Sequence, residues 1–310
     1  MGRSKELMKR NKNSIRLSRE DKIVNGVSIL IALFVLLVTV YPIYYCVIYA
    51  FSDGISAQAK HIYFLPVQFT LANFKAVFSD KLLVHSFVIS VLRTAASVVT
   101  GVSFTALMAY GLTRKELKGQ KIYSMIAMFT MYFGGGVIPT YLLYQKMGLL
   151  NSFAVYIVPS LLSVYNMLLF MAFFRDLPES LVESAKLDGA GVLTIFVRIV
   201  VPLSKPIFAT ISLFVGVGAW NDWYAAAYYI NDQKLMPMST ILMRLVSAAN
   251  AAEKAMEAVT ASGANVHVSG PTSTSIQYAT MLVSIVPVMC VYPFVQKYFV
   301  KGIMIGAVKA

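Results

Sequence analysis

The chain has 310 residues, of which 58% are hydrophobic and only 13% are charged. A mean hydropathy of +0.68 excludes a soluble domain with a single buried core and predicts an integral membrane protein. The net charge of +13 does not indicate a nucleic-acid partner, because the basic residues are dispersed among apolar runs.

Six apolar segments follow a basic tail over residues 1–22. Each is long enough to cross about 30 Å of hydrocarbon, where a single segment must satisfy its own backbone by forming a helix. We therefore expect an all-α integral membrane fold, with a six-helix domain over 23–300 and a short tail over 301–310. The predicted spans are residues 23–51, 85–112, 122–144, 153–174, 207–230 and 278–299.

The basic residues divide unequally between the two sides of such a bundle. The two chain ends, residues 114–121 and the stretch 175–206 hold 19 of the 27 Lys and Arg. Seven lie in segments on the opposite side, chiefly the long outer loops 52–84 and 231–277. The positive-inside rule therefore predicts that both termini and the stretch 175–206 are cytoplasmic.

Two parts of the second outer loop have different expected structures. Residues 238–258 are expected to form a surface helix. Residues 262–275 contain two Gly, one Pro and many Ser and Thr, so this segment is expected to be flexible.

Arg93 is a charged residue inside the second predicted span, roughly 12 Å from its outer end at about 1.5 Å per helical residue. A charge at that depth costs at least about 2.5–3.5 kcal/mol, so the side chain should face the bundle, pair with another group or reach outward. The sequence leaves two roles open, a structural pairing and a position on a path for a transported solute.

Three consecutive glycines, Gly134, Gly135 and Gly136, interrupt the third predicted span shortly before Pro139. They remove side chains and the proline removes one backbone donor, so a kink or break is expected there. A broken helix can build a transport site, but a packing bend or an early helix end explains the same residues.

An aromatic and polar cluster lies in the outer half of the fifth predicted span, and it includes the only acidic residue of the six spans, Asp222. Aromatic faces stack on the C–H faces of sugar rings, while Asn and Asp can hydrogen bond to hydroxyls. The cluster also fits an aromatic belt at the membrane interface with a structural Asp, and both interpretations stay open. Its residues are Trp220, Asn221, Asp222, Trp223 and Tyr224.

The stretch 175–206 carries four basic and four acidic residues between two apolar spans. Pro178 predicts a helix start, and Gly189 after Asp188 predicts its end. A second short helix is predicted to end at Pro202 and Pro206. Its apolar stripe, spaced i, i+3, i+4 and i+7, consists of Val192, Ile195, Phe196 and Ile199.

No recognisable catalytic or nucleotide-binding motif occurs in the chain, so neither enzyme activity nor a bound cofactor is predicted. Cys46 and Cys290 lie in apolar runs, and the three histidines are far apart without metal-ligand spacing. The sequence therefore predicts no disulfide framework and no metal site.

The spacing within 175–206 resembles the EAA motif of ABC importer permeases, which reads Glu-Ala-Ala, three residues, Gly, nine residues and Ile-x-Leu-Pro. Here Glu183-Ser184-Ala185, Gly189 and Ile199-Val200-Val201-Pro202 keep both gaps, with Ser and Val as conservative replacements. Further segments resemble the maltose-type carbohydrate uptake permeases, and within them the branch associated with complex oligosaccharides. Those segments are residues 69–74, 134–141, 220–223 and 292–302.

The resemblance implies a type I ABC importer fold in which residues 175–206, here called the coupling loop, dock on a cytoplasmic ATPase subunit. Glu183 would make polar contacts with the ATPase, Ala185 would pack in its cleft, and Gly189 would form the turn. Ile199 and Pro202 would close the second helix against the bundle. The residues assigned to coupling are Glu183, Ser184, Ala185, Asp188, Gly189, Ile199 and Pro202.

The same resemblance implies the partners of the chain in a bacterial cytoplasmic (inner) membrane. They are a second, homologous permease subunit in a heterodimer, two ABC ATPase subunits that hold ATP and Mg²⁺, and an extracytoplasmic solute-binding protein docked on the outer loops. The expected cargo is an oligosaccharide or polysaccharide fragment, with Arg93 and residues 220–224 as candidates for the substrate path. Two alternatives remain: an importer of peptides, polyamines or another polar solute, and an ion-coupled secondary transporter.

Overall fold

A computed structural model describes residues 18–60, 62–261 and 271–307. Most of the basic tail, and the predicted flexible segment over residues 262–270, lie outside the described residues. Three helices are long and apolar. The first is α2 (Arg19–Ala50), and the last is α17 (Ser273–Ala307). The second is a continuous run of α5 (Lys81–Ser97), η1 (Val98–Val102) and α6 (Ser103–Thr113). The last predicted tail, residues 301–310, is thus helical through Ala307, because α17 continues past the predicted span.

Each of the other three predicted spans is interrupted by a break. Among the described residues, three continuous helices could cross a membrane, or up to six if three bent pairs of helices each count as one span. The third of these pairs joins residues 192–203 to residues 205–221, so it differs from the fifth predicted span. The third span consists of α7 (Gln120–Tyr132) and α8 (Val137–Lys146), which meet at 118°. The predicted break at the glycines is therefore confirmed, and Gly136 adopts a φ of +81° that an L side chain rarely takes.

The fourth and fifth predicted spans were expected to be continuous, and both are broken. In the fourth, α9 (Ala154–Ile157) and η2 (Val158–Ser160) end before α10 (Val164–Arg175), whose first turn is capped by Ser163. Pro159 removes a backbone donor and favours this break. In the fifth, which was predicted to run to residue 230, α14 (Lys205–Asn221) ends at Asn221, and α15 (Tyr224–Tyr229) follows a two-residue break.

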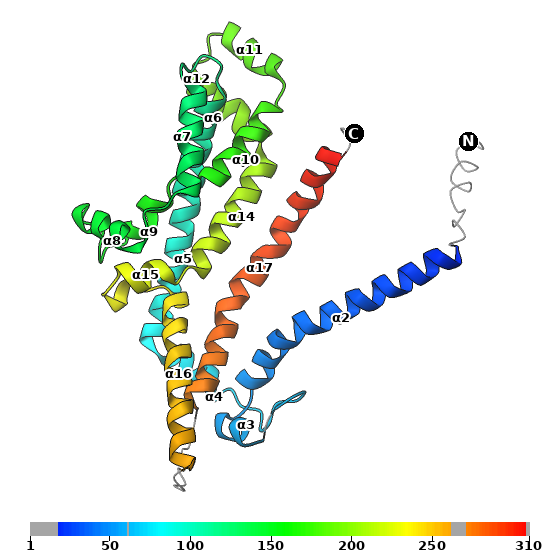
Figure 1. Cartoon of the computed structure of the whole chain (residues 1–310), viewed down its shortest axis with the longest axis vertical. Helices are drawn as coiled ribbons and strands as arrows, with labels where there is room; N and C mark the ends of the chain where they lie inside the picture. Colours follow the sequence, from blue (N-terminus) through cyan, green and yellow to red (C-terminus); the bar gives the residue numbers. More distant parts are fainter. Residues whose placement is uncertain (1–17, 61, 262–270, 308–310) are drawn as a thin grey trace.

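Two ends of the molecule carry different elements (Figure 1). The coupling loop, with α11 (Glu179–Leu187) and α12 (Val192–Ile195), lies at one end beyond α6, α7 and α10. The opposite end carries α3 (Gly54–Lys60), α4 (Ala72–Ser79) and α16 (Met238–Ala261). Loops predicted to share a side therefore gather at the same end of the bundle.

The helix predicted over 238–258 exists as α16, but its first turns are not on the surface. Met238, Thr240 and Ile241 are buried, because α16 packs against α5 and α17. That burial depends on contacts with helices far apart in the chain, which the segment by itself does not reveal.

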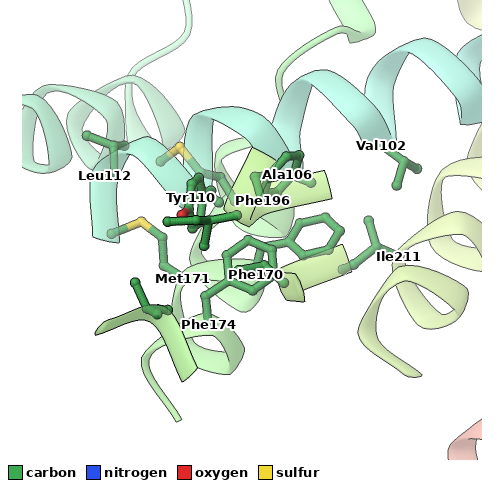
Figure 2. Close-up of a cluster of buried hydrophobic side chains, with 14 of the residues drawn as sticks. Val102, Ala106, Tyr110, Leu112, Phe170, Met171, Phe174, Phe196 and Ile211 are labelled. Carbon is green, nitrogen blue, oxygen red and sulfur yellow. The ribbon is translucent and has the colours of Figure 1, made fainter. Parts of the chain in front are cut away.

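An aromatic core joins the coupling loop to the bundle (Figure 2). Phe170 and Phe174 of α10 pack against Phe208 of α14, with ring centroids 4.9 and 6.5 Å apart respectively. Phe196, in the second helix of the coupling loop, packs 4.9 Å from the Tyr110 ring of α6. Because protein interiors are densely packed, a displacement of the coupling loop must move these helices with it.

Candidate functional site

The first coupling helix, α11, begins after Pro178 and ends as the sequence predicts. Gly189 has a φ of +79°, and the Ala190 N–H donates to the Ala185 carbonyl at 2.9 Å. The Gly189 N–H donates to the Lys186 carbonyl at 3.0 Å. This pair of bonds is the Schellman ending of a helix, which requires a left-handed residue at this position. Gly189 therefore sets the direction in which the chain leaves α11.

A substitution series tests this turn. A Cβ at Gly189 would meet no other atom within 4 Å, so only the backbone conformation opposes a side chain. We expect Gly189→Val to strain the turn by about 1–2 kcal/mol and weaken retention of the ATPase subunit during purification of the complex. Gly189→Asn is the matched control, because Asn tolerates the left-handed conformation and should retain the ATPase; equal retention by both variants would contradict the prediction.

The faces of α11 separate inward from outward residues. Val182 and Ala185 are each 9% exposed and belong to the chain's own core, whereas Glu183, Ser184 and Asp188 are exposed. Ala185 therefore packs in this chain's own core, and its predicted packing in an ATPase cleft stays a prediction. Leu187, which the sequence analysis did not select, is 89% exposed at the end of α11. The only indication of Leu187 in the sequence is that it is apolar but does not lie on the face of α11 that Val182 and Ala185 turn toward the core.

The second coupling helix continues further than predicted. It runs through α12, a wide π-helical segment η3 (Phe196–Val200) and α13 (Val201–Leu203), so Pro202 lies inside it. The wider π turn before Pro202 accommodates the missing donor and the bulk of the ring. The chain then turns by 85° into α14, which begins with Pro206 in its first turn.

The apolar stripe of the second helix is only partly correct. Ile195 and Phe196 are buried and Ile199 packs against the same core, as the spacing predicts. Val192 is 58% exposed, which contradicts the stripe at its first position. Pro202 is also exposed, so its side chain does not close the helix against the bundle. Val192 lies at the first turn of the helix, where the chain has just left the glycine turn and has not yet reached the core.

Two ion pairs join the coupling loop to the turn between α6 and α7. Lys115 Nζ lies 2.5 Å from Glu179 Oε1, and Lys186 pairs with Glu116. The hydrogen bond from Lys115 lowers the pKa of Glu179, and the hydrogen bond from Lys186 lowers the pKa of Glu116. All four side chains are solvent-exposed, so the pairs add little stability and serve mainly to orient α11.

Glu183 differs from Glu179 in having no such partner. Within the part of the chain that the structure describes, its carboxylate forms no hydrogen bond and no ion pair. Beside these residues an open pocket of about 580 Å³ is lined by Arg114, Arg175 and Glu179 among others. The outward surface of α11 thus offers the unpaired carboxylate of Glu183 and two exposed leucines, Leu181 and Leu187, to a partner.

A second candidate site lies at the break between α14 and α15. Arg93 is 3% exposed, and its Nη1 donates to the Asp222 carbonyl at 2.7 Å while its Nη2 pairs with the Asp222 carboxylate. The guanidinium also lies 4.2 Å from the centroid of the Tyr156 ring. The structure therefore favours structural pairing for Arg93, and it joins two residues that the sequence analysis considered separately. Tyr156 has no sequence signal, since it is one aromatic in an apolar run.

Asp222 fixes the backbone conformation at the break between α14 and α15 by hydrogen bonding. Its Oδ1 accepts the backbone N–H of Tyr224 at 2.9 Å and of Ala225 at 3.2 Å, which caps α15. Two hydroxyls of α16 donate further hydrogen bonds to backbone carbonyls of the break, Ser239 to Asp222 at 3.0 Å and Thr240 to Trp223 at 3.1 Å. The non-helical backbone is thus hydrogen-bonded from α5, α15 and α16.

The aromatic cluster divides into a buried and an exposed part. Trp220 is 9% exposed and donates from Nε1 to the Ser284 carbonyl at 3.0 Å, so it fastens α14 to α17. Asn221, Trp223 and Tyr224 are exposed, with Trp223 at 39% and Tyr224 at 38%. Tyr228, one turn further along α15, is 49% exposed and was not selected from the sequence. Among the described residues, no group of three or more metal-ligating side chains occurs.

Comparison with known proteins identifies the family. The family model for the binding-protein-dependent transport system inner membrane component matches residues 23–305. The chain is 35% identical to the polygalacturonan/rhamnogalacturonan transport system permease protein YtcP of Bacillus subtilis (strain 168), covering 93% of this chain and 98% of that one. It is 34% identical to protein LplC of the same organism, over 88% of this chain and 90% of that one.

A solved structure agrees with the fold. In the crystal structure of a bacterial ABC transporter involved in the import of the acidic polysaccharide alginate, one chain is 29% identical to this one, with a TM-score of 0.82. The match covers 91% of this chain and 98% of that chain. The expected type I ABC importer permease fold is thus confirmed, including its multi-pass helical architecture. The chain belongs to the family of binding-protein-dependent transport system inner membrane components, whose members are transport permeases.

Proposed function

We propose that this chain is the non-catalytic permease subunit of an ATP-driven importer of oligosaccharides or polysaccharide fragments. The chain belongs to a family of transport permeases, and the observation that supports the proposal most directly is the composition of the outward face of α11. There an unpaired Glu183 and an exposed Leu187 lie on a helix whose ending is fixed by Gly189. This face fits a docking surface for an ATPase subunit that supplies the ATP and Mg²⁺.

The connections of the coupling loop support a mechanical role. The loop is joined to α10 on one side and to α14 on the other, and its second helix packs into the same aromatic core as both. Closure of two ATPase subunits would displace the docked loop, and the core would carry that displacement to α6, α10 and α14. The bundle would then alternate between inward-facing and outward-facing states by rigid-body movement.

The relatives and the exposed aromatic residues support a carbohydrate cargo. YtcP is a permease for polygalacturonan and rhamnogalacturonan, and the solved relative belongs to an importer of alginate. Trp223 and Tyr224 present exposed ring faces beside Asn221, which suits pyranose rings and their hydroxyls. Peptides or polyamines would require acidic or backbone-binding groups, whereas Asp222 is already paired with Arg93.

The complete importer would contain partners on both sides of the membrane. We infer a second permease subunit beside this one, two ATPase subunits on the coupling loop, and a solute-binding protein on the outer end formed by α3, α4 and α16. Both termini and the coupling loop would be cytoplasmic, in agreement with their basic residues.

Reconstituted transport tests the proposal. The chain, its partner permease and the ATPase subunits are purified together, reconstituted in proteoliposomes and supplied with the binding protein and a radiolabelled galacturonic acid trisaccharide or maltotriose. We expect uptake that requires internal ATP and continues when an uncoupler dissipates the ion gradients. Uptake of neither saccharide, or uptake driven by an ion gradient without ATP, would contradict the proposed function.

A further inference from the structure

A pocket of about 580 Å³ lies between the bundle and the inner side of the coupling loop. Its lining residues come from the end of α6, the start of α7, the end of α10 and the coupling loop, at one end of the molecule (Figure 1). Pockets that bind small ligands commonly enclose about 300–1,000 Å³. The pocket is therefore large enough for a ligand, and its lining residues indicate which kind.

The charges of the lining do not balance. Three of the lining residues are basic, Arg114, Lys115 and Arg175, whereas Glu179 is the only acidic one. Lys115 is paired with Glu179. Among the described residues, neither Arg114 nor Arg175 forms a hydrogen bond or an ion pair. The pocket thus keeps two guanidinium groups without a counter-ion.

Arg114 gives the clearest indication of a missing partner. Its Nε atom is buried and has no hydrogen-bond partner within the described chain. The guanidinium carbon lies over the Tyr110 ring, 4.3 Å from its centroid. An aromatic face contacts the plane of the guanidinium and leaves the N–H groups at its edge free to donate. Because buried polar atoms without a partner are rare, a ligand that accepts from Arg114 would explain this one.

The rest of the lining is largely apolar and lies where membrane helices end. Thr113, also in the lining, is the last residue of the long membrane-crossing run that begins at Lys81, and Arg175 is the last residue of α10. Positive charges therefore lie beside an apolar wall at the end of the bundle. The apolar lining residues are Phe174, Leu177, Val182 and Val200, which all belong to or pack against the core.

The start of α7 adds to the positive potential. Gln120 lines the pocket and is the first residue of this 13-residue helix, and the positive end of a helix favours a nearby anion. Guanidinium groups bind phosphate oxygens with two parallel hydrogen bonds. Basic pockets between membrane helices on the cytoplasmic side bind anionic lipid head groups. The combination of two free arginines, a helix start and an apolar wall favours a phosphate carried by an amphipathic molecule.

We propose that this pocket binds a phosphate group, supplied by an anionic phospholipid of the cytoplasmic leaflet or by a free phosphate. Arg114 and Arg175 pair with its oxygens. The proposal goes beyond the proposed function and takes from it only the cytoplasmic side of the coupling loop. Val182 places the pocket on the inward face of α11, away from Glu183, so the ligand braces the loop without occupying the face that meets the ATPase.

The test titrates the purified transporter complex, in an uncharged detergent, with dioleoylphosphatidylglycerol and follows the thermal midpoint. A ligand that binds the folded state raises the midpoint as its concentration rises. We expect Arg114→Gln and Arg175→Gln each to need about tenfold more lipid for the same rise, because a charge-assisted hydrogen bond is lost. Lys118→Gln, at an exposed lysine of the same turn outside the lining, is the matched control and should respond as the wild type does.

Three ligands distinguish the sources of the phosphate. Dioleoylphosphatidylcholine has the same acyl chains but no net charge, so it should leave the midpoint unchanged. A rise with inorganic phosphate that both arginine variants weaken assigns the pocket to a free phosphate. A rise with phosphatidylglycerol but not with inorganic phosphate assigns it to the lipid head group.

The proposal fails if the wild-type complex responds to neither phosphatidylglycerol nor inorganic phosphate, or if the arginine variants respond as the wild type does. Should Arg114→Gln not assemble, the exposed Arg175 decides the test, because its replacement breaks no polar contact within the described residues. Loss of the ATPase from both arginine variants, with Lys118→Gln unaffected, would also overturn it, since the arginines would then contact the ATPase. None of these measurements uses a saccharide, so the proposed cargo is tested separately.

Discussion

Replacing Glu183 with alanine is expected to abolish ATP-driven uptake by the assembled transporter while the chain remains folded. The side chain is exposed and has no hydrogen-bond or ion-pair partner among the described residues, so its removal breaks nothing within the chain. If it pairs with the ATPase, truncation should cost about 2–5 kcal/mol, because the partner's charge is left unpaired in the interface. That cost lowers the affinity for the ATPase by more than about tenfold.

Glu179 offers a matched control on the same helix. It is also exposed, but its carboxylate is already engaged by Lys115. Glu179→Ala should therefore retain most of the uptake. The measurements are ATPase co-purification, ATP hydrolysis stimulated by the binding protein, and uptake in proteoliposomes. Full activity of Glu183→Ala, or an equal loss in both variants, would show that α11 does not dock through Glu183.

The second large effect is expected from Asp222→Asn, which keeps a capping side chain for α15 but removes the charge that pairs with Arg93. Arg93 is 3% exposed, so its guanidinium would be left buried without a counter-ion. Breaking a buried pair in this way costs about 3–5 kcal/mol, and the partial exposure of Asp222 places the expected loss near the lower value, about 3 kcal/mol. The thermal midpoint of the purified complex should fall accordingly.

A double variant and a second aspartate make this prediction specific. Arg93→Gln combined with Asp222→Asn removes both charges and should recover much of the lost midpoint, because no ion is then left unpaired. Asp232→Asn is the control, since Asp232 also caps a helical turn, through the Lys234 N–H at 2.9 Å, and forms no ion pair among the described residues. A midpoint that is equally low in the single and double variants would exclude the ion pair as the cause.

The coupling loop and the break between α14 and α15 are expected to affect transport in different ways. The coupling loop lies at one end of the bundle, where its exposed polar and apolar side chains would meet the proposed ATPase subunit. The break between α14 and α15 lies within the bundle, where every backbone group must be satisfied and every charge paired. Substitutions at the first should change coupling at constant stability, and substitutions of Arg93 or Asp222 should change stability first.

Several features of the protein follow from the sequence because they depend on local chemistry. The apolar runs predicted the membrane class and six candidate crossings, since hydrophobic length is a property of one segment. Gly189 predicted the end of α11, because only a residue that tolerates a positive φ can form that turn. The three glycines likewise predicted the break between α7 and α8. The motif around Glu183 and Gly189 resembled the family that the comparisons then identified.

Other features were decided by contacts between segments far apart in the chain. Arg93 and Asp222 are 129 residues apart, and although Asp222 is the only acidic residue of the predicted spans, their spacing does not indicate that they pair with each other and with Tyr156. The burial of Ala185 and the exposure of Leu187 depend on how α11 lies on the bundle, which the short helix does not encode alone. Local propensity and hydrophobic length thus determined the elements and the family, whereas the tertiary structure decided which charges are paired and which aromatic residues stay exposed.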